Sequence, residues 1–219
     1  MILKDNSKSW KINLVYQWSS TIYVAMLGFL VTVLLARNLG VEQFGSYSYI
    51  LSLAGIFLIF QDGGYKTLIF RNSVDNSSSI LLSNAVAHVL SVTFIGLTII
   101  IVWQSKYWLA IFFAIGSMAL VVFSGFVSSI LKGRNDFKLD AIWKVVIRSS
   151  TAIGILFFLF FIENSSLAYL FVCWFLALLL VLIWPMSKGY LIWPSFKFNN
   201  DLLKSSMVFL TIDVATVFY

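Results

Sequence analysis

Long runs of apolar residues, separated by short polar segments, dominate this chain. Six of the runs are long enough to cross a membrane as helices, because a bilayer core about 30 Å thick needs about 20 apolar residues per helix. These runs cover Leu14–Ala36, Phe44–Phe60, Ile80–Trp103, Trp108–Leu131, Ala141–Ile162 and Leu167–Pro185. A seventh begins at Leu203 and meets the chain end at Tyr219. None shows the polar and apolar alternation of a barrel strand, so all are predicted to be helices.

The pattern predicts an all-α fold, a polytopic membrane helical bundle. Residues 1–13 are expected to form a cytoplasmic N-terminus, residues 14–186 a lobe of six transmembrane helices, and residues 187–202 a cytoplasmic linker. Residues 203–219 would start the seventh helix, so we expect a truncated chain. Short polar turns such as Asn38-Leu39-Gly40 and Asp62-Gly63-Gly64 favour antiparallel neighbours.

The overall composition agrees with a membrane protein. Hydrophobic residues make up 60% of the chain and charged residues only 11%, whereas a soluble domain carries roughly a quarter charged residues. A cleaved signal peptide is the alternative for the first run, because Lys4, Lys8 and Lys11 precede it. That run is about twice as long as the apolar region of a signal peptide and has no small-residue cleavage site, which favours a retained helix.

The basic residues predict the orientation. Only Arg37 and Lys106 fall on the side opposite the N-terminus. The other thirteen lie on the N-terminal side: Lys4, Lys8, Lys11, Lys66, Arg71, Lys132, Arg134, Lys138, Lys144, Arg148, Lys188, Lys197 and Lys204. Cytoplasmic loops are enriched in Lys and Arg, so the N-terminus is predicted to be cytoplasmic. The net charge of +6 therefore reflects membrane orientation, and nucleic acid is not expected as a partner.

Residues for catalysis or metal binding are scarce. His88 is the only histidine, which excludes a His-rich metal cluster, and Cys173 is the only cysteine, which excludes an internal disulfide. The chain has no phosphate-binding Gly-rich loop of the Walker type. Asp136 and Asp140 share one face at a helix start, but the basic residues around them indicate a solvated loop. We therefore predict no enzymatic activity, no metal and no cofactor.

Polar side chains recur at helical spacing inside three of the runs. Asn84, His88 and Ser91 form one stripe, and Lys144, Arg148 and Thr151 form a second, both at i, i+4 and i+7. The first run carries a third group in its first half, namely Gln17, Ser20 and Thr21. Because polar groups are costly in hydrocarbon, they are expected to face the bundle interior or a water-filled cavity.

Each stripe also has a structural interpretation. The Ser and Gly residues of the second run, Ser48, Ser52 and Gly55, favour helix packing. His88 fits a hydrogen-bonded interior histidine better than a proton carrier. Lys144 lies close enough to the boundary for its ammonium to reach the lipid headgroups. Arg148 lies about 10 Å deeper than the loop. Its guanidinium suits bidentate phosphate recognition, so an anion-facing role and a structural role both stay open.

Four segments resemble those of a known family. The segment LLARNLGVEQFGSY at residues 34–47 resembles the junction after the first helix of polysaccharide-exporting flippases of the multidrug/oligosaccharidyl-lipid/polysaccharide superfamily. Three shorter segments resemble that family's later turns and its entry to the seventh helix: FQDGGY at residues 60–65, ILKGRNDF at 130–137 and LLKSSM at 202–207. The chain departs from the pattern where Met207-Val208-Phe209 replaces the proline that often follows the seventh-helix entry.

The resemblance implies an O-antigen flippase of the bacterial inner membrane. Such a protein translocates undecaprenyl-pyrophosphate-linked oligosaccharide for surface polysaccharide synthesis, with this chain as the N-terminal one of two lobes. Its partners would be the lipid-linked oligosaccharide, membrane lipid, and the polysaccharide polymerase and glycosyltransferases of the same pathway. The residues expected to line the substrate cavity are Arg148, Lys144, Thr151, His88, Asn84 and Gln17, and those expected to couple an ion are Asp62 and Asp213.

Three alternatives stay open at this stage. An ion-coupled drug or metabolite exporter of the same superfamily would normally need an acidic cation site. Few acidic residues lie in or near the predicted helices to form one, namely Asp62, Glu163 and Asp213. A membrane-embedded glycosyl or acyl transferase is disfavoured by the absence of clustered carboxylates. A non-transport scaffold or assembly subunit predicts no protection of the Lys144 and Arg148 positions by cargo.

Overall fold

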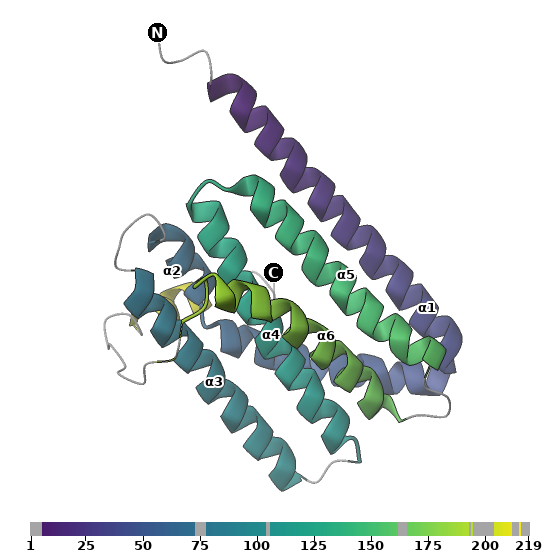
Figure 1. The fold of residues 1–219 in the computed structure, drawn as a ribbon. Coiled ribbons are helices and arrows are strands. Elements are labelled where there is room, and N and C mark those ends of the chain that lie inside the picture. Colours follow the sequence, from purple (N-terminus) through teal and green to yellow (C-terminus); the bar gives the residue numbers. More distant parts are fainter. Residues whose placement is uncertain are drawn as a thin grey trace.

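The computed structural model describes residues 6–72, 78–103, 106–161, 166–192, 194, 204–211 and 215, and the regular elements within these ranges are helices. In chain order they are α1 (Asn6–Asp62), α2 (Tyr65–Asn72), α3 (Ser78–Trp103), α4 (Trp108–Gly133), α5 (Phe137–Phe161) and α6 (Leu167–Ser187), drawn in Figure 1. Residues 204–211 are also helical. Within the described ranges, five helices are long and apolar enough to cross a membrane: α1, α3, α4, α5 and α6.

Helix α1 contains both of the first two predicted runs. It has 57 residues, and a straight helix of that length would measure about 85 Å, far more than a bilayer core. Gly40 interrupts it, with φ 70° and ψ 176°, and Figure 1 shows the chain reversing there. A side chain at Gly40 would meet nothing within 4 Å, so the glycine is needed for its backbone conformation. The turn predicted at Asn38–Gly40 is therefore a kink at one residue.

Helix α2 lies in a stretch that the apolar pattern treats only as a polar connection. Gly63 and Gly64, at φ 54° and 76°, separate it from the end of α1. Tyr65, Leu68 and Ile69 are its buried face, packed in a cluster with residues of α3 and α4. Burial raises the pKa of Tyr65 above the ordinary 10.0, so its hydroxyl stays protonated while it hydrogen-bonds Ser206. Helix α2 thereby links the end of α1 to residues 204–211.

The other long helices agree with the predicted runs to within a few residues. Runs Ile80–Trp103, Trp108–Leu131, Ala141–Ile162 and Leu167–Pro185 correspond to α3, α4, α5 and α6. The turn between α4 and α5 contains Asn135 in the left-handed conformation, at φ 60°. Of the predicted seventh run, residues 204–211 are helical, whereas Asp213 lies outside the described residues.

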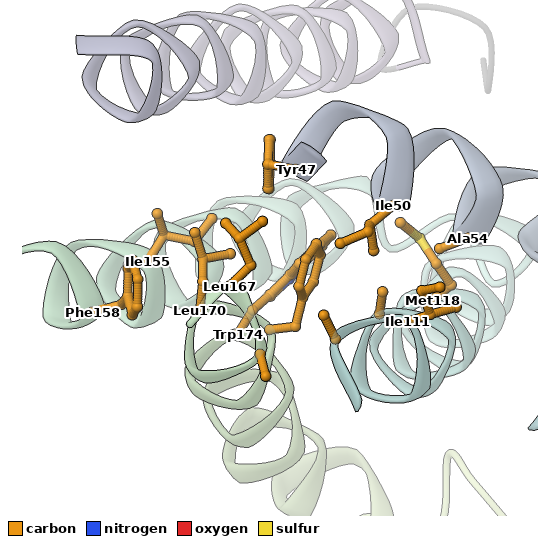
Figure 2. Packing of buried hydrophobic residues seen from close by; sticks show 14 of the residues in the cluster. Tyr47, Ile50, Ala54, Ile111, Met118, Ile155, Phe158, Leu167, Leu170 and Trp174 are labelled. Carbon is orange, nitrogen blue, oxygen red and sulfur yellow. The ribbon is translucent and has the colours of Figure 1, made fainter. Parts of the chain in front are cut away.

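The main core lies where the second arm of α1 packs against α4, α5 and α6. Figure 2 shows Tyr47, Ile50 and Ala54 of that arm facing Ile111 and Met118 of α4 and Trp174 of α6. Helices α5 and α6 approach closely at Gly154, where an added Cβ would lie 2.8 Å from the carbonyl oxygen of Cys173. Small residues permit such approach between membrane helices. The packing fixes α5 between α1 and α6, where its polar face meets the first arm of α1.

Candidate functional site

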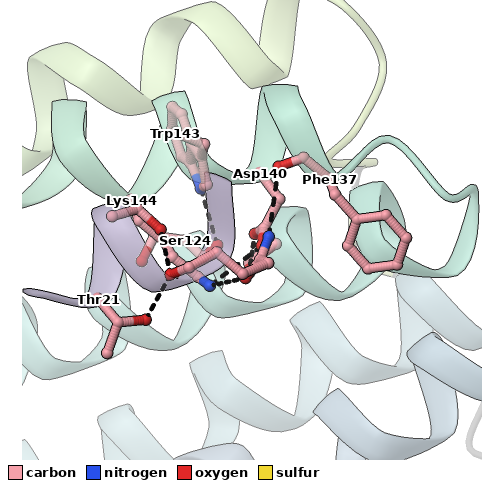
Figure 3. Close-up of polar contacts among 9 residues, drawn as sticks. Thr21, Ser124, Phe137, Asp140, Trp143 and Lys144 are labelled. Atoms are coloured by element: carbon pink, nitrogen blue, oxygen red, sulfur yellow. Dashed lines mark hydrogen bonds and ion pairs between the residues drawn. The ribbon is translucent and has the colours of Figure 1, made fainter. Parts of the chain in front are cut away.

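A polar network joins α1, α4 and α5 near the α4–α5 turn. The carboxamide Nε2 of Gln17 donates to Asp140 Oδ2 at 2.7 Å, and Lys144 Nζ lies 3.1 Å from the same oxygen. Lys144 also donates to Gln17 Oε1 at 2.6 Å, which closes a triangle among the three side chains. Ser128 of α4 donates to the other carboxylate oxygen, Oδ1. Figure 3 shows Asp140 and Lys144 at the centre of these contacts.

The interpretation of Asp140 as part of a solvated loop is wrong. Its side chain is completely buried, and all of its partners come from inside the bundle. The neighbouring Asp136 behaves differently, since its Oδ1 accepts a hydrogen bond from the backbone N–H of Leu139 at 3.3 Å and caps the start of α5. Basic residues nearby in sequence misled the prediction, because the burial of Asp140 follows from its contacts with α1 and α4 and not from its sequence neighbours.

Arg148 lies one turn beyond Lys144 and is half-buried. Its guanidinium rests on the backbone of α1 at Gly28, where an added Cβ would come within 2.2 Å of Nη2. Among the described residues Arg148 makes no hydrogen bond and no ion pair, although it interacts electrostatically with Tyr47. A cation with five N–H donors thus lies between two apolar helices without a counter-ion from the described chain.

Other polar residues of α5 serve helix contacts. Thr151 is buried, and its Oγ1 donates to the carbonyl of Ile147 at 3.0 Å. Ser149 pairs with the hydroxyl of Tyr23 on α1 at 2.8 Å, a contact that the stripe analysis did not identify. Nothing in the sequence indicated this contact, because neither Tyr23 nor Ser149 belongs to one of the predicted polar stripes. Together with the contacts of Gln17, the Tyr23–Ser149 pair ties α5 to the first arm of α1.

Asn84 and His88 lie in a separate group on α3. His88 Nε2 donates to the carbonyl of Phe60 at 2.9 Å, and its ring centroid lies 5.2 Å from that of Tyr65. The bond satisfies a carbonyl at the end of α1 that has no intrahelical partner. Asn84 is buried one turn earlier. The six predicted cavity residues therefore divide into two groups, with Gln17, Lys144, Arg148 and Thr151 along α1 and α5.

Asp62, one of the two predicted ion-coupling residues, pairs with a lysine. Its Oδ2 lies 3.3 Å from Lys66 Nζ, and the Lys66 side chain crosses Gly125 of α4, where an added Cβ would come within 2.3 Å of Cε. Asp213 lies outside the described residues. Among the residues that the structure describes, no group of three or more His, Cys, Asp or Glu side chains could hold a metal ion.

Two of the cavities formed by the described residues lie apart from the α1–α5 polar network. One, of about 470 Å³, has an apolar lining between α3 and α6 that includes Leu90, Phe123 and Met186. The other, of about 360 Å³, has a mixed lining beside the α1 kink. None of the six predicted cavity residues lines either of them. The α1–α5 cations instead lie along a helix-to-helix seam.

Comparison with known proteins identifies a family. The family described as "polysaccharide biosynthesis protein" matches residues 11–218, nearly the whole chain. No curated protein and no solved structure matches. The matched range includes every described residue of the α1–α5 seam.

Proposed function

The chain belongs to the polysaccharide biosynthesis protein family, and from this premise we propose that it is a flippase for undecaprenyl-pyrophosphate-linked oligosaccharide. Membership of this family supports a role as a flippase or transporter and not as an enzyme. The proposed cargo supplies O-antigen, capsule or exopolysaccharide synthesis at the bacterial inner membrane. It carries a pyrophosphate between a hydrocarbon tail and a sugar, so its carrier needs a cation at membrane depth.

Arg148 is the observation that carries this proposal. Intramembrane ionisable residues are costly and usually pair with each other or line a solute path. Lys144 follows the first pattern, because Asp140 and Gln17 hold it. Arg148 has no such partner in the described chain, and its planar donors match the oxygens of a phosphate. We assign the pyrophosphate contact to Arg148, because the charge of Lys144 one turn away is already balanced by Asp140.

The proposed topology follows from the kink in α1. If each arm of α1 crosses the membrane once, the described helices make six crossings, with the N-terminus and the α4–α5 turn on the cytoplasmic side. The cytoplasmic end of the seam between α1 and α5 then lies at the Gln17–Asp140–Lys144 network, on the side where a lipid-linked sugar is assembled. This arrangement lets the headgroup reach Arg148 while the tail stays in lipid.

The deciding experiment replaces Arg148 in the full-length gene at its own locus. Arg148→Ala is expected to insert at normal abundance and to lose most surface polysaccharide, whereas Arg148→Lys keeps the charge without the planar fork and retains part of it. Arg37→Ala is the matched control, since Arg37 is an exposed cation on α1 away from the seam. Full export by Arg148→Ala at normal abundance would refute the assignment. A fall in abundance that matches the fall in export would indicate a structural role.

An ion-coupled exporter of drugs or metabolites is the second candidate, and buried Asp140 is the observation that favours it. A carboxylate inside the lobe is what a cation site requires, and the sequence interpretation had overlooked this one. Its pairing with Lys144 weakens the case, because an internal ammonium already balances the charge. Efflux of a cationic dye by the full-length protein, abolished by Asp140→Asn, would favour the exporter over the flippase.

A further inference from the structure

A pocket of about 360 Å³ lies at the end of the bundle opposite the α4–α5 turn. Three separate segments line it, namely the start of the second α1 arm, the residues that enter α4, and the residues that enter α6. Its volume falls in the range of small-molecule sites. We call it the kink pocket, and the polar and aromatic residues that matter in its lining are Glu42, Gln43, Ser46, Lys106, Tyr107 and Trp108.

The side chains of the kink pocket combine opposite charges with neutral hydrogen-bonding groups. Glu42 and Lys106 are both exposed and form no ion pair with each other or with any other described residue. Gln43 adds a carboxamide that both donates and accepts. The formal charges of Glu42 and Lys106 cancel, so the lining as a whole gives neither a phosphate nor a cation a net attraction. The lining therefore favours an uncharged ligand with many donors and acceptors.

Aromatic surface supplies the other half of the recognition. Trp108 is 48% exposed at the first position of α4. Tyr107 is fixed beside it, since its hydroxyl lies 3.1 Å from Ser46 Oγ and Lys106 Nζ lies 5.5 Å from its ring centroid. A sugar ring has an apolar face of C–H groups and an edge of hydroxyls, and a flat indole with polar neighbours is complementary to both.

Backbone donors add to this set. The pocket includes the first residues of both α4 and α6, Trp108 and Leu167, where N–H groups lack intrahelical partners. Neither helix has a side-chain cap at its preceding residue, Tyr107 or Ser166. These N–H groups are available to hydroxyl or acetamido oxygens of a ligand, in addition to the side chains that define the pocket.

We propose that the kink pocket binds a neutral saccharide unit, stacked on Trp108 and hydrogen-bonded by Glu42, Gln43 and Lys106. The proposal rests on the proposed function for one point, which is that the sugar part of the cargo reaches this end of the bundle as it leaves the membrane. The pocket would then hold the sugar at the exit while Arg148 releases the pyrophosphate. The binding chemistry itself can be measured without transport.

The test is saturation-transfer difference NMR on the full-length protein in nanodiscs, titrated with N,N′-diacetylchitobiose and, separately, cellobiose. At least one disaccharide is expected to bind saturably, with an affinity that falls about tenfold in Trp108→Ala and survives in Trp108→Phe. Arg37→Ala is the matched control, because it removes an exposed cation at the same end of the bundle without touching the lining. Its affinity is expected to equal that of the wild type.

Two results would overturn the proposal. One is the absence of saturable binding by both disaccharides, or equal binding by wild type and Trp108→Ala. The other is displacement of the bound sugar by inorganic pyrophosphate, which would make the pocket an anion site. Either result leaves the flippase assignment to be judged separately by export in Arg148→Ala. Conversely, normal export by Arg148→Ala together with sugar binding that still depends on Trp108 would refute the proposed function and leave the sugar site standing.

Discussion

Lys144 Nζ lies 3.1 Å from Oδ2 of Asp140, which sits one turn earlier on α5 with its side chain completely buried. The pair differs from an ordinary surface i, i+4 pair because Gln17 from α1 and Ser128 from α4 bind the same carboxylate. Four side chains from three helices thus form one network around the Asp140 carboxylate. Removing Asp140 leaves the partly buried ammonium of Lys144 without its counter-ion, which costs more than the intact pair contributes.

The first prediction concerns the loss of one charged partner from this network. Asp140→Ala is expected to lower thermal stability of the purified protein, by about 3 kcal/mol in the free energy of unfolding, because Lys144 loses its counter-ion. The double variant Asp140→Leu with Lys144→Met removes both charges and is expected to recover most of that loss. Melting curves in detergent measure both. A double variant no more stable than Asp140→Ala would show that the charge pair is not the source of the loss.

The run lengths predicted most of the fold, and they did so for a physical reason. A bilayer sets the length of a crossing helix, so α3, α4, α5 and α6 could be located from hydrophobicity alone. Helix α2 was missed because its short amphipathic sequence carries no membrane-length signal. Gly40 could be predicted as a turn, but the polar residues around it do not reveal that only Gly40 leaves the helical conformation.

The site was harder to predict than the helices. The stripe on α5 grouped Lys144 with Arg148 by spacing, yet spacing does not reveal a partner from another helix. Asp140 shows the problem most clearly. Basic residues lie near it in sequence, and one of them, Lys144, is its ion-pair partner. Its other two side-chain partners, Gln17 and Ser128, lie 123 and 12 residues away on α1 and α4. Which face of a helix is buried follows from tertiary packing.

The second prediction tests whether His88 carries protons. Its Nε2 bond to the Phe60 carbonyl and its contact with Tyr65 indicate a structural role. His88→Gln keeps a donor on a side chain of similar reach. We therefore expect near-normal abundance and an unchanged dependence of export on external pH, while His88→Ala lowers stability by about 1 kcal/mol. A shifted pH profile in His88→Gln would instead place the imidazole in a proton path.

The third prediction tests the proposed orientation. Lys106→Cys and Arg134→Cys, each in a Cys173→Ala background, place single exposed thiols at opposite ends of the bundle. A membrane-impermeant maleimide added to intact cells is expected to label position 106 and to spare position 134 until the cells are opened. Labelling of 134 but not 106 would reverse the orientation and place the α4–α5 turn outside.

The last prediction uses the contact between Gly28 and Arg148. A methyl group at position 28 would lie 2.2 Å from Nη2, so Gly28→Ala forces the guanidinium away from its seat on α1 while leaving its charge in place. The displaced atoms belong to the end of a flexible side chain, and alanine favours helix by about 1 kcal/mol over glycine, so folding is not expected to suffer. If Arg148 contacts cargo in a defined geometry, export is expected to fall roughly tenfold at normal abundance.

Gly55→Ala is the matched control for that experiment. It is the same substitution in the other arm of α1, at a helical glycine where an added Cβ meets nothing within 4 Å, and it is expected to leave export unchanged. Surface polysaccharide and membrane abundance are measured together for both variants. Equal export by the two would show that the position of the guanidinium does not matter, because charge alone at this depth would then suffice for the cargo. A loss confined to Gly28→Ala ties export to the placement of Arg148 against α1.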